Sequence, residues 1–186
     1  VLAASVNLDV IAVVSINEDN TVRLQSQGYP MDHVALSDLE IKPEEINRSA
    51  SLIRGMAKKF TLEGHQIGGF DAYTTSNVLK GSGLSSSAAF EVLVGTMMSH
   101  LFNGGSVGAV EIAKYAQYAE NVYFGKPSGL MDQMASSVGG MIAIDFADTQ
   151  SPVIRQVKFD FDALGCALCI VDTGGNHADL THEYAA

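Results

Sequence analysis

The chain has 186 residues and a net charge of −10, with 21 acidic against 11 basic side chains, which argues against binding nucleic acid or an anionic membrane by bulk electrostatics. Hydrophobic residues make up 47% of the chain, a share that is ordinary for a globular α/β enzyme. The sequence has no apolar run long enough to span a membrane and no recognisable signal peptide, so we expect a cytoplasmic protein. Any phosphate must then be bound locally, by backbone amides, a metal ion or a few placed cations.

The first half of the chain predicts strands followed by a helix. Residues 1–16 are rich in β-branched side chains and predict one or two strands. Beyond a polar turn, residues 21–27 alternate apolar and polar side chains like a half-buried strand, whereas residues 29–42 predict a loop. A helix is expected over 43–60, because apolar residues recur there at three- and four-residue spacing. Residues 65–78 resemble a strand with glycines.

The second half of the chain predicts helices first and then strands. Helices are expected over 86–102 and 107–121, with a short one inside 130–140. Apolar runs predict strands in three further segments, which are 140–146, 153–161 and 167–174. Because hairpin strands and helices are mixed rather than strictly alternating, the pattern indicates an α+β fold.

Two cysteines, Cys166 and Cys169, form a C-x-x-C pair inside the last apolar run. A zinc site would need a second pair of ligands at suitable spacing, and none is evident. A redox pair usually opens a helix, whereas this pair lies in a run that resembles a strand. We therefore expect two reduced thiols in the core.

The two ends of the chain resemble the interior of a longer protein. Residues 1–14 read as strand from the first position, and residues 180–186 resemble the middle of a helix. We therefore expect the chain to be a piece of a longer polypeptide.

The stretch "GSGLSSSAA" over residues 81–89 leads into the helix expected from Ser86. One interpretation is a plain connector, since Gly and Ser are common in loops and Ser caps helices. The other is an anion cradle, because small residues let a phosphate approach the free amides at a helix N-terminus. The stretch matches neither the P-loop pattern nor the dinucleotide pattern G-x-G-x-x-G. A serine hydroxyl at such a helix start can also bind Mg²⁺.

Two acids later in the chain are candidates for phosphoryl-transfer chemistry, which needs a metal ligand and often a carboxylate beside the nucleophile. Glu120 ends an otherwise apolar and neutral helical stretch, and Asp132 is surrounded by apolar and small residues. A single acid on a helix is more often solvated, so neither acid alone indicates a site. The two are candidates because both lie among apolar, neutral or small residues.

The segments "GLSSSAAFEV" and "AENVYFGKPSGLMDQMAS" together resemble the galactokinase branch of the kinases named after galactokinase, homoserine kinase, mevalonate kinase and phosphomevalonate kinase. The G-L-[SG]-S-S-A signature is typical of the superfamily. The S-G-L-M-D-Q element, whose aspartate follows the glutamate of Ala-Glu by twelve residues, is typical of its sugar kinases. The resemblance covers nearly the whole chain.

The resemblance implies a two-layer N-terminal domain of this superfamily over 1–163, with a mixed sheet packed against helices, and the start of a second α+β domain over 164–186. It implies transfer of phosphate from ATP to the C1 hydroxyl of galactose, with Mg²⁺ as cofactor. Galactose and ATP are the expected partners, without nucleic acid or membrane, and the oligomeric state is left open.

The resemblance also assigns roles to single residues. Asp132 matches the catalytic aspartate, and Gly129 and Tyr184 match positions that contact the sugar. Glu120 matches the metal-binding glutamate, and Ser87 or a neighbouring serine is expected to complete the metal site. The expected phosphate-binding loop consists of Gly81, Gly83, Leu84, Ser85, Ser86, Ser87 and Ala88.

The sequence departs from the family pattern at three places. Leu79 stands where the family usually has a proline, a change that we expect to affect loop stiffness and not chemistry. An upstream motif with an arginine, a glutamate, a histidine and an aspartate is absent, as is a late glycine-rich motif. The chain thus resembles the central part of a galactokinase.

Two alternatives stay open from the sequence. One is a related sugar-1-kinase that acts on an amino sugar or a pentose, because such enzymes share the S-G-[LVI]-M-D-Q element. The other is a non-catalytic sensor of galactose and ATP on the same fold. The intact "GLSSSAA" favours an enzyme.

Overall fold

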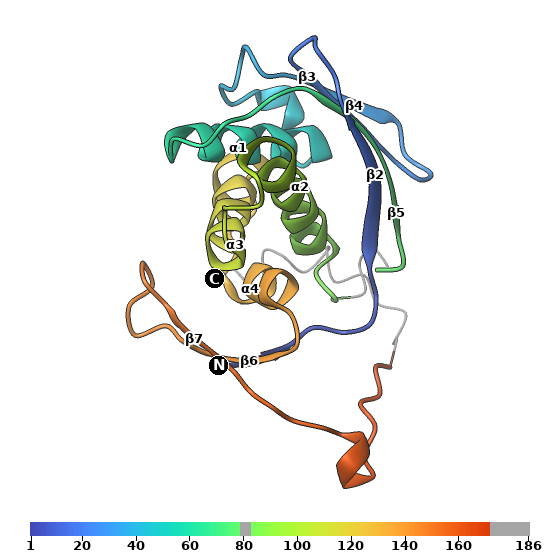
Figure 1. Ribbon diagram of the computed structural model, residues 1–186, viewed down its shortest axis with the longest axis vertical. Helices are drawn as coiled ribbons and strands as arrows, with labels where there is room; N and C mark the ends of the chain where they lie inside the picture. Colours follow the sequence, from blue (N-terminus) through green and yellow to red (C-terminus); the bar gives the residue numbers. More distant parts are fainter. Residues whose placement is uncertain (79–82, 172–186) are drawn as a thin grey trace.

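The computed structural model describes residues 1–78 and 83–171, and in it two separate sheets lie around a group of helices (Figure 1). The larger sheet has the order β2-β5-β3-β4, and the smaller one has the order β1-β6-β7. Their strands are β1 (Leu2–Ala4), β2 (Val10–Ile16), β3 (Thr21–Ser26), β4 (Met31–Ala35), β5 (Phe70–Ser76), β6 (Met141–Asp145) and β7 (Val153–Gln156). Strands β3 and β5 are parallel and the other pairs are antiparallel.

Four α-helices pack between the sheets, namely α1 (Ser49–Leu62), α2 (Ser86–Asn103), α3 (Ala109–Tyr118) and α4 (Met131–Val138). Two short 3₁₀ segments, η1 (Pro43–Glu45) and η3 (Asp162–Leu164), and a π-helix, η2 (Ala119–Phe124), complete the elements. The expected α+β class with a mixed sheet is confirmed. The strands form two sheets because β1 pairs with β6 while β2, a few residues later, pairs with β5.

Strand alternation directs one face of the larger sheet toward the helices. Val22 and Leu24 in β3 and Phe70 in β5 are fully buried, and they pack with Met56 and Phe60 of α1 in the main core. Each second residue along β3 points the other way. This pattern explains why residues 21–27 were recognised correctly as a half-buried strand.

Helix α1 is held very close to the π-helix η2. A Cβ at Gly55 of α1 would lie 2.8 Å from the Cβ of Ala119, the first residue of η2. Only a glycine leaves room for this approach. The neighbour of Ala119 is Glu120, so this contact places one of the two candidate acids.

A smaller core joins α3, α4 and the β1-β6-β7 sheet. Its buried members are Ala113, Leu130, Met134, Ile142 and Ile144. Strand β6 supplies Ile142 and Ile144 from one face, again through alternation. This core fixes α4, and therefore Asp132, relative to α3.

Several boundaries differ from those expected. Residues 31–35 form strand β4 rather than loop, since they pair with β3 and bury Val34. The helix expected from residue 43 begins only at Ser49, after the 3₁₀ turn η1. The helix expected over 107–121 ends at Tyr118 and continues as the π-helix, a change in hydrogen-bond register that periodicity does not reveal.

The segment after β7 corrects the expectation for the cysteines. Residues 167–171 are described without strand structure, and both Cys166 and Cys169 are exposed rather than buried. Figure 1 shows residues 157–171 extending away from the helices as far as η3 and then turning back. The large apolar side chains of this segment, such as Leu168 and Val171, are exposed. None of the described helices is long and apolar enough to cross a membrane.

Candidate active site

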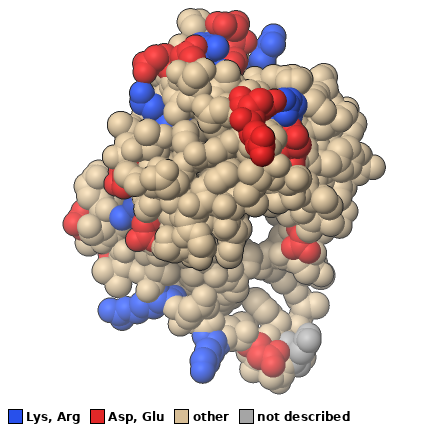
Figure 2. All heavy atoms as spheres, turned by 45° about the horizontal axis from the view of Figure 1, so that its top comes forward, with Lys and Arg blue, Asp and Glu red and all other residues tan. Residues whose placement is uncertain are grey.

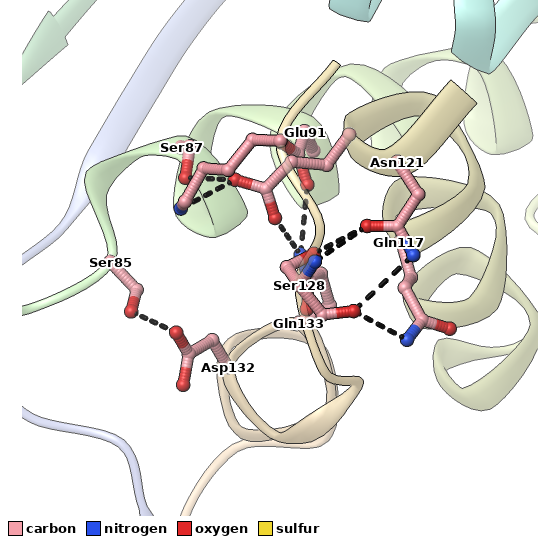
Figure 3. Close-up of polar contacts among 10 residues, drawn as sticks. Ser85, Ser87, Glu91, Gln117, Asn121, Ser128, Asp132 and Gln133 are labelled. Atoms are coloured by element: carbon pink, nitrogen blue, oxygen red, sulfur yellow. Dashed lines mark hydrogen bonds and ion pairs between the residues drawn. The ribbon is translucent and has the colours of Figure 1, made fainter. Parts of the chain in front are cut away.

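The start of helix α2 is the centre of the candidate site. Ser85, its N-cap residue, has a left-handed backbone (φ 57°, ψ 54°), and Gly83 also has a positive φ of 78°. The Ser85 hydroxyl makes no capping bond to its own helix. It donates instead to Oδ2 of Asp132 in the first turn of α4 (Figure 3). The unusual backbone of Ser85 thus directs its hydroxyl to the expected catalytic acid.

Ser87, two residues further along α2, contacts the second acid. Its hydroxyl donates to Oε1 of Glu120 at 2.8 Å. The same oxygen accepts from Lys126 Nζ at 2.9 Å, in an ion pair whose carboxylate is almost fully buried. Two serines at the start of α2 therefore hold two acids from two different elements.

Glu120 is ionised more readily than an ordinary glutamate. Burial acts to raise the pKa of Glu120. Hydrogen bonds from Ser128, Lys126 and Ser87, together with the Lys126 charge, outweigh burial, so this pKa lies below its usual value. The result is a buried carboxylate that keeps its negative charge, as a ligand for a hard cation must.

Behind Glu120 lie a third buried acid and a buried amide. Gln133 Nε2 donates to Glu120 Oε2 at 2.7 Å and to Glu91 Oε2 at 3.3 Å. Glu91 lies on α2 one turn beyond Ser87, and all three side chains are fully or almost fully buried. Burial, together with the charge of Glu120, raises the pKa of Glu91 well above its ordinary value.

The loop before α4 is fixed by side-chain amides. Asn121 Oδ1 accepts from the backbone N–H of Ser128 at 2.8 Å and from its hydroxyl at 3.0 Å. The Ser128 carbonyl accepts from Gln117 at 3.1 Å and from Asn121 at 3.2 Å (Figure 3). These bonds place Gly129, whose missing side chain leaves open space within 4 Å. The backbone at this position is therefore accessible to a ligand.

A cleft of about 540 Å³ opens between β1, the segment after it, and the starts of α2 and α4. Its walls include Gly83, Leu84, Ser85 and Asp132, whereas Ser87 and Glu120 are not among the residues that line it. The volume falls in the range of small-molecule sites. Asp132 thus faces a space in which a small polar ligand fits.

Figure 2 shows how charged side chains are distributed over one face of the molecule. On the face shown in Figure 2, acidic and basic side chains lie in small groups at the top, the sides and the bottom of the view, and most of this face is uncharged.

Residues 51–140 match the family described as the GHMP kinases N-terminal domain. This central part of the chain is a GHMP kinase domain. It contains both serines, both candidate acids and Gln133, so the match covers the whole cluster described above.

Individual relatives narrow the resemblance to one branch of the GHMP kinases. The chain is 36% identical over 174 residues to the galactokinase of Streptomyces coelicolor, which covers 94% of this chain and 45% of that protein. The crystal structure of Lactococcus lactis galactokinase complexed with galactose matches with a TM-score of 0.73 at 28% identity, covering 86% of this chain and 42% of that one. The resemblance to galactokinases is thereby confirmed.

The likeness to a kinase of another kind shows the fold alone. The structure of a D-glycero-D-manno-heptose 1-phosphate kinase from Bacteroides thetaiotaomicron has a TM-score of 0.69 at 19% identity and covers 86% of this chain and 51% of that one. The chain spans less than half the length of the curated galactokinases that it matches.

The oxygen atoms of Ser87 and Glu120 fit a magnesium ion by their chemistry. The Ser87 hydroxyl and the ionised Glu120 carboxylate offer oxygen ligands that touch each other. Within the described residues, no three His, Cys, Asp or Glu side chains gather as a closed metal site. Mg²⁺ commonly takes one or two carboxylates and completes its shell with water and substrate phosphates, so the two donors fit this cation.

The structure brings together most of the expected site residues. Gly83 to Ala88, Glu120 and Asp132 lie around the start of α2, as the bonds of Ser85 and Ser87 show, and Gly129 lies in the loop before α4. Gly81 and Tyr184, like Leu79, lie outside the described residues. The expectations for Gly81 and Tyr184 therefore stay predictions.

Three residues of the cluster were not among the site residues expected from the sequence. Glu91 follows Ser87 by four residues, a spacing that places both on one face of the expected helix. Gln133 is adjacent to Asp132, and Lys126 lies in the loop between the two acids. The first two were recognisable as neighbours of expected site residues, whereas the Lys126 contact depends on the loop path.

Proposed function

We propose that this chain is the central part of a sugar kinase that transfers the γ-phosphoryl group of ATP to the C1 hydroxyl of galactose. The observation that carries the proposal is the pairing of Ser85 with Asp132 and of Ser87 with Glu120. It brings a carboxylate for the nucleophile and a carboxylate for a metal to the start of one helix. Similarity to the galactokinase of Streptomyces coelicolor supports galactose as the acceptor.

The start of α2 is assigned to the phosphates of ATP. The first turn of a helix has unpaired N–H groups and a partial positive charge. Ser85 leaves these N–H groups uncapped because its hydroxyl is bonded to Asp132. Residues 83–88, with Gly81 as a further predicted member, thus form the proposed phosphate cradle.

Asp132 is assigned to the acceptor hydroxyl. Its carboxylate faces the cleft and orients the C1 hydroxyl of the sugar, whose oxygen forms the new bond to the γ-phosphorus while the bond to the bridging oxygen of ADP breaks. The hydroxyl proton passes to the Asp132 carboxylate. Gly129, and Tyr184 by prediction, contact the sugar.

Ser87 and Glu120 are assigned to Mg²⁺. When bound, this ion neutralises charge on the transferred phosphoryl group. Before the ion binds, hydrogen bonds from Ser87, Lys126 and Gln133 already hold the two carboxylate oxygens of Glu120 in place.

A cytoplasmic location remains a prediction from the sequence.

The test uses the complete protein with galactose and Mg·ATP, with ³¹P NMR to identify the product. We expect a sugar 1-phosphate signal that depends on galactose and on Mg²⁺. The same assay with N-acetylgalactosamine and with arabinose checks the choice of acceptor. Turnover only with one of these sugars would overturn galactose, and binding of galactose and ATP without turnover would indicate a sensor.

A further inference from the structure

Gln133 occupies a special position between two buried acids. Its Nε2 lies 2.7 Å from Glu120 Oε2 and 3.3 Å from Glu91 Oε2, and the side chain has no exposed surface. The amide NH₂ carries two hydrogens, one for each carboxyl group. Figure 3 shows this side chain reaching from α4 to the acids of the neighbouring elements.

The chemistry of this position requires an amide nitrogen. A glutamate here would add a third buried carboxyl, and an apolar side chain would remove the donor from Oε2 of Glu120 and from Oε2 of Glu91. Two buried oxygen atoms beside these bonds lack a partner. Gln133 Oε1, the acceptor of the same amide, and Glu91 Oε1 have no hydrogen-bond partner among the described residues. Buried unpaired acceptors are unusual, so the arrangement calls for a reason other than packing.

The contact divides the two oxygens of Glu120 between two tasks. Oε2 is bound to Gln133, whereas Oε1 faces Ser87 and Lys126. Rotation of the carboxylate out of its present plane would break the bond to Gln133. An amide that holds Oε2 therefore keeps Oε1 directed to the start of α2.

We propose that Gln133 is a positioning residue that orients Glu120 for metal binding, with Glu91 holding the amide from the opposite side. This inference rests on the proposed function, since it takes Glu120 as the metal ligand. Partners that orient a metal-binding carboxylate in this way affect affinity although they do not touch the ion.

The placement of Gln133 also links the two acids of the site. Gln133 follows Asp132 in the first turn of α4, and Asp132 is bonded to Ser85 while Gln133 is bonded to Glu120. One turn of α4 therefore contacts Ser85 directly and is linked to Ser87 through Glu120. A displacement of this turn moves the acceptor acid and the metal ligand together.

The experiment measures binding of Mn²⁺ to the complete protein by electron paramagnetic resonance, with a non-hydrolysable ATP analogue present. Gln133→Met keeps the size of the side chain and removes the amide. We expect Mn²⁺ to bind on the order of 10–100-fold more weakly, as for other partners of metal-binding carboxylates. The KM for galactose should stay close to the wild-type value.

Ser99→Ala is the matched control for a lost buried hydrogen bond. Ser99 lies on α2, the helix of Ser87 and Glu91, is buried, and bonds to both the carbonyl and the N–H of Val107. We expect this variant to melt at a lower temperature and to bind Mn²⁺ like the wild type. Gln133→Asn, which keeps an amide but shortens its reach, replaces Gln133→Met if circular dichroism shows that the latter does not fold.

Each outcome decides the inference. Weaker Mn²⁺ binding in a folded Gln133 variant, with Ser99→Ala unchanged, supports it. Mn²⁺ binding at wild-type strength in a folded Gln133 variant overturns the inference alone, and failure of both Gln133 variants to fold overturns it in favour of a structural role. No Mn²⁺ binding by the wild-type protein would overturn the proposed metal site and the inference with it.

Discussion

Ser85 donates its hydroxyl to Asp132 across 47 positions of sequence, from a backbone conformation that serine seldom adopts. Neither residue is deeply buried, and both line the same cleft. A serine at a helix start usually caps its own helix, whereas this one holds a carboxylate of another helix. The relationship gives Asp132 a fixed orientation before any ligand arrives.

Replacement of Asp132 by Asn tests the catalytic assignment. The change keeps the shape and an acceptor for Ser85 but removes the charge that accepts the sugar proton. We expect kcat of the complete protein to fall about 10²–10⁴-fold. If Asp132 served only the dipole of α4, stability would fall by less than about 1 kcal/mol and turnover would persist. Steady-state kinetics with a melting curve separate these results.

Ser85→Gly tests whether Ser85 acts through Asp132. Glycine adopts the left-handed conformation without strain, so the fold should be kept while the hydroxyl is lost. We expect kcat to fall on the order of 10-fold, because a hydrogen bond to a charged group is lost. The decisive measurement is the double variant. In an Asp132→Asn background the Ser85 change should add little, and fully additive effects would show that the two residues act independently.

Lys126→Met tests the ion pair with Glu120. The ammonium compensates an almost fully buried carboxylate and occupies the oxygen that also faces Ser87. Without it, the protein should melt at a lower temperature in the absence of metal, and Mg²⁺ with an ATP analogue should raise the melting temperature more than in the wild type. Differential scanning fluorimetry with and without Mg²⁺ measures both effects. An identical metal-induced shift in the two proteins would argue that Lys126 and the metal do not share Glu120.

Glu91→Gln tests the cost of a buried acid. Because burial raises the pKa of Glu91 in the folded protein well above its unfolded value, the folded state keeps its proton when the unfolded state has lost it. The free energy of unfolding should therefore decrease as the pH rises from the unfolded pKa toward the folded one, and this contribution is absent in Glu91→Gln. Urea unfolding across pH 4–8 should show that the variant gains stability relative to the wild type as the pH increases. A constant difference across this range would contradict the raised pKa.

Gly55→Ala tests how the fold places Glu120. The added Cβ would lie 2.8 Å from the Cβ and 2.9 Å from the Cα of Ala119, a backbone atom that cannot rotate away. We expect overpacking to cost about 1–3 kcal/mol of stability and to shift η2 away from α1. Mn²⁺ binding should weaken as well, because Glu120 follows Ala119 in η2. Urea unfolding and Mn²⁺ resonance check the two parts, and wild-type stability would show that η2 adapts freely.

The sequence by itself predicted the elements whose signals are local. The alternation of residues 21–27, the helix that starts at Ser86 and the short helix around Asp132 follow from side-chain periodicity and small-residue loops, and the structure confirms them. The motifs around residues 81–89 and around Asp132 also indicated the family, since the residues of each motif are close together along the chain. Strand β4 was missed because its pairing with β3, and not its composition, makes it a strand.

Only the tertiary structure decided which side chains meet. Ser85 and Asp132, Ser87 and Glu120, and Gln133 with two acids are pairs that lie far apart in sequence, and their contacts depend on the packing of α2, η2 and α4. The register change from α3 to the π-helix η2 and the close approach at Gly55 turn Glu120 toward Ser87. The two exposed cysteines also show that burial depends on the tertiary structure, because an apolar run is buried only where other elements cover it. Local periodicity specifies a helix or a strand, whereas burial and side-chain contacts are properties of the assembled elements.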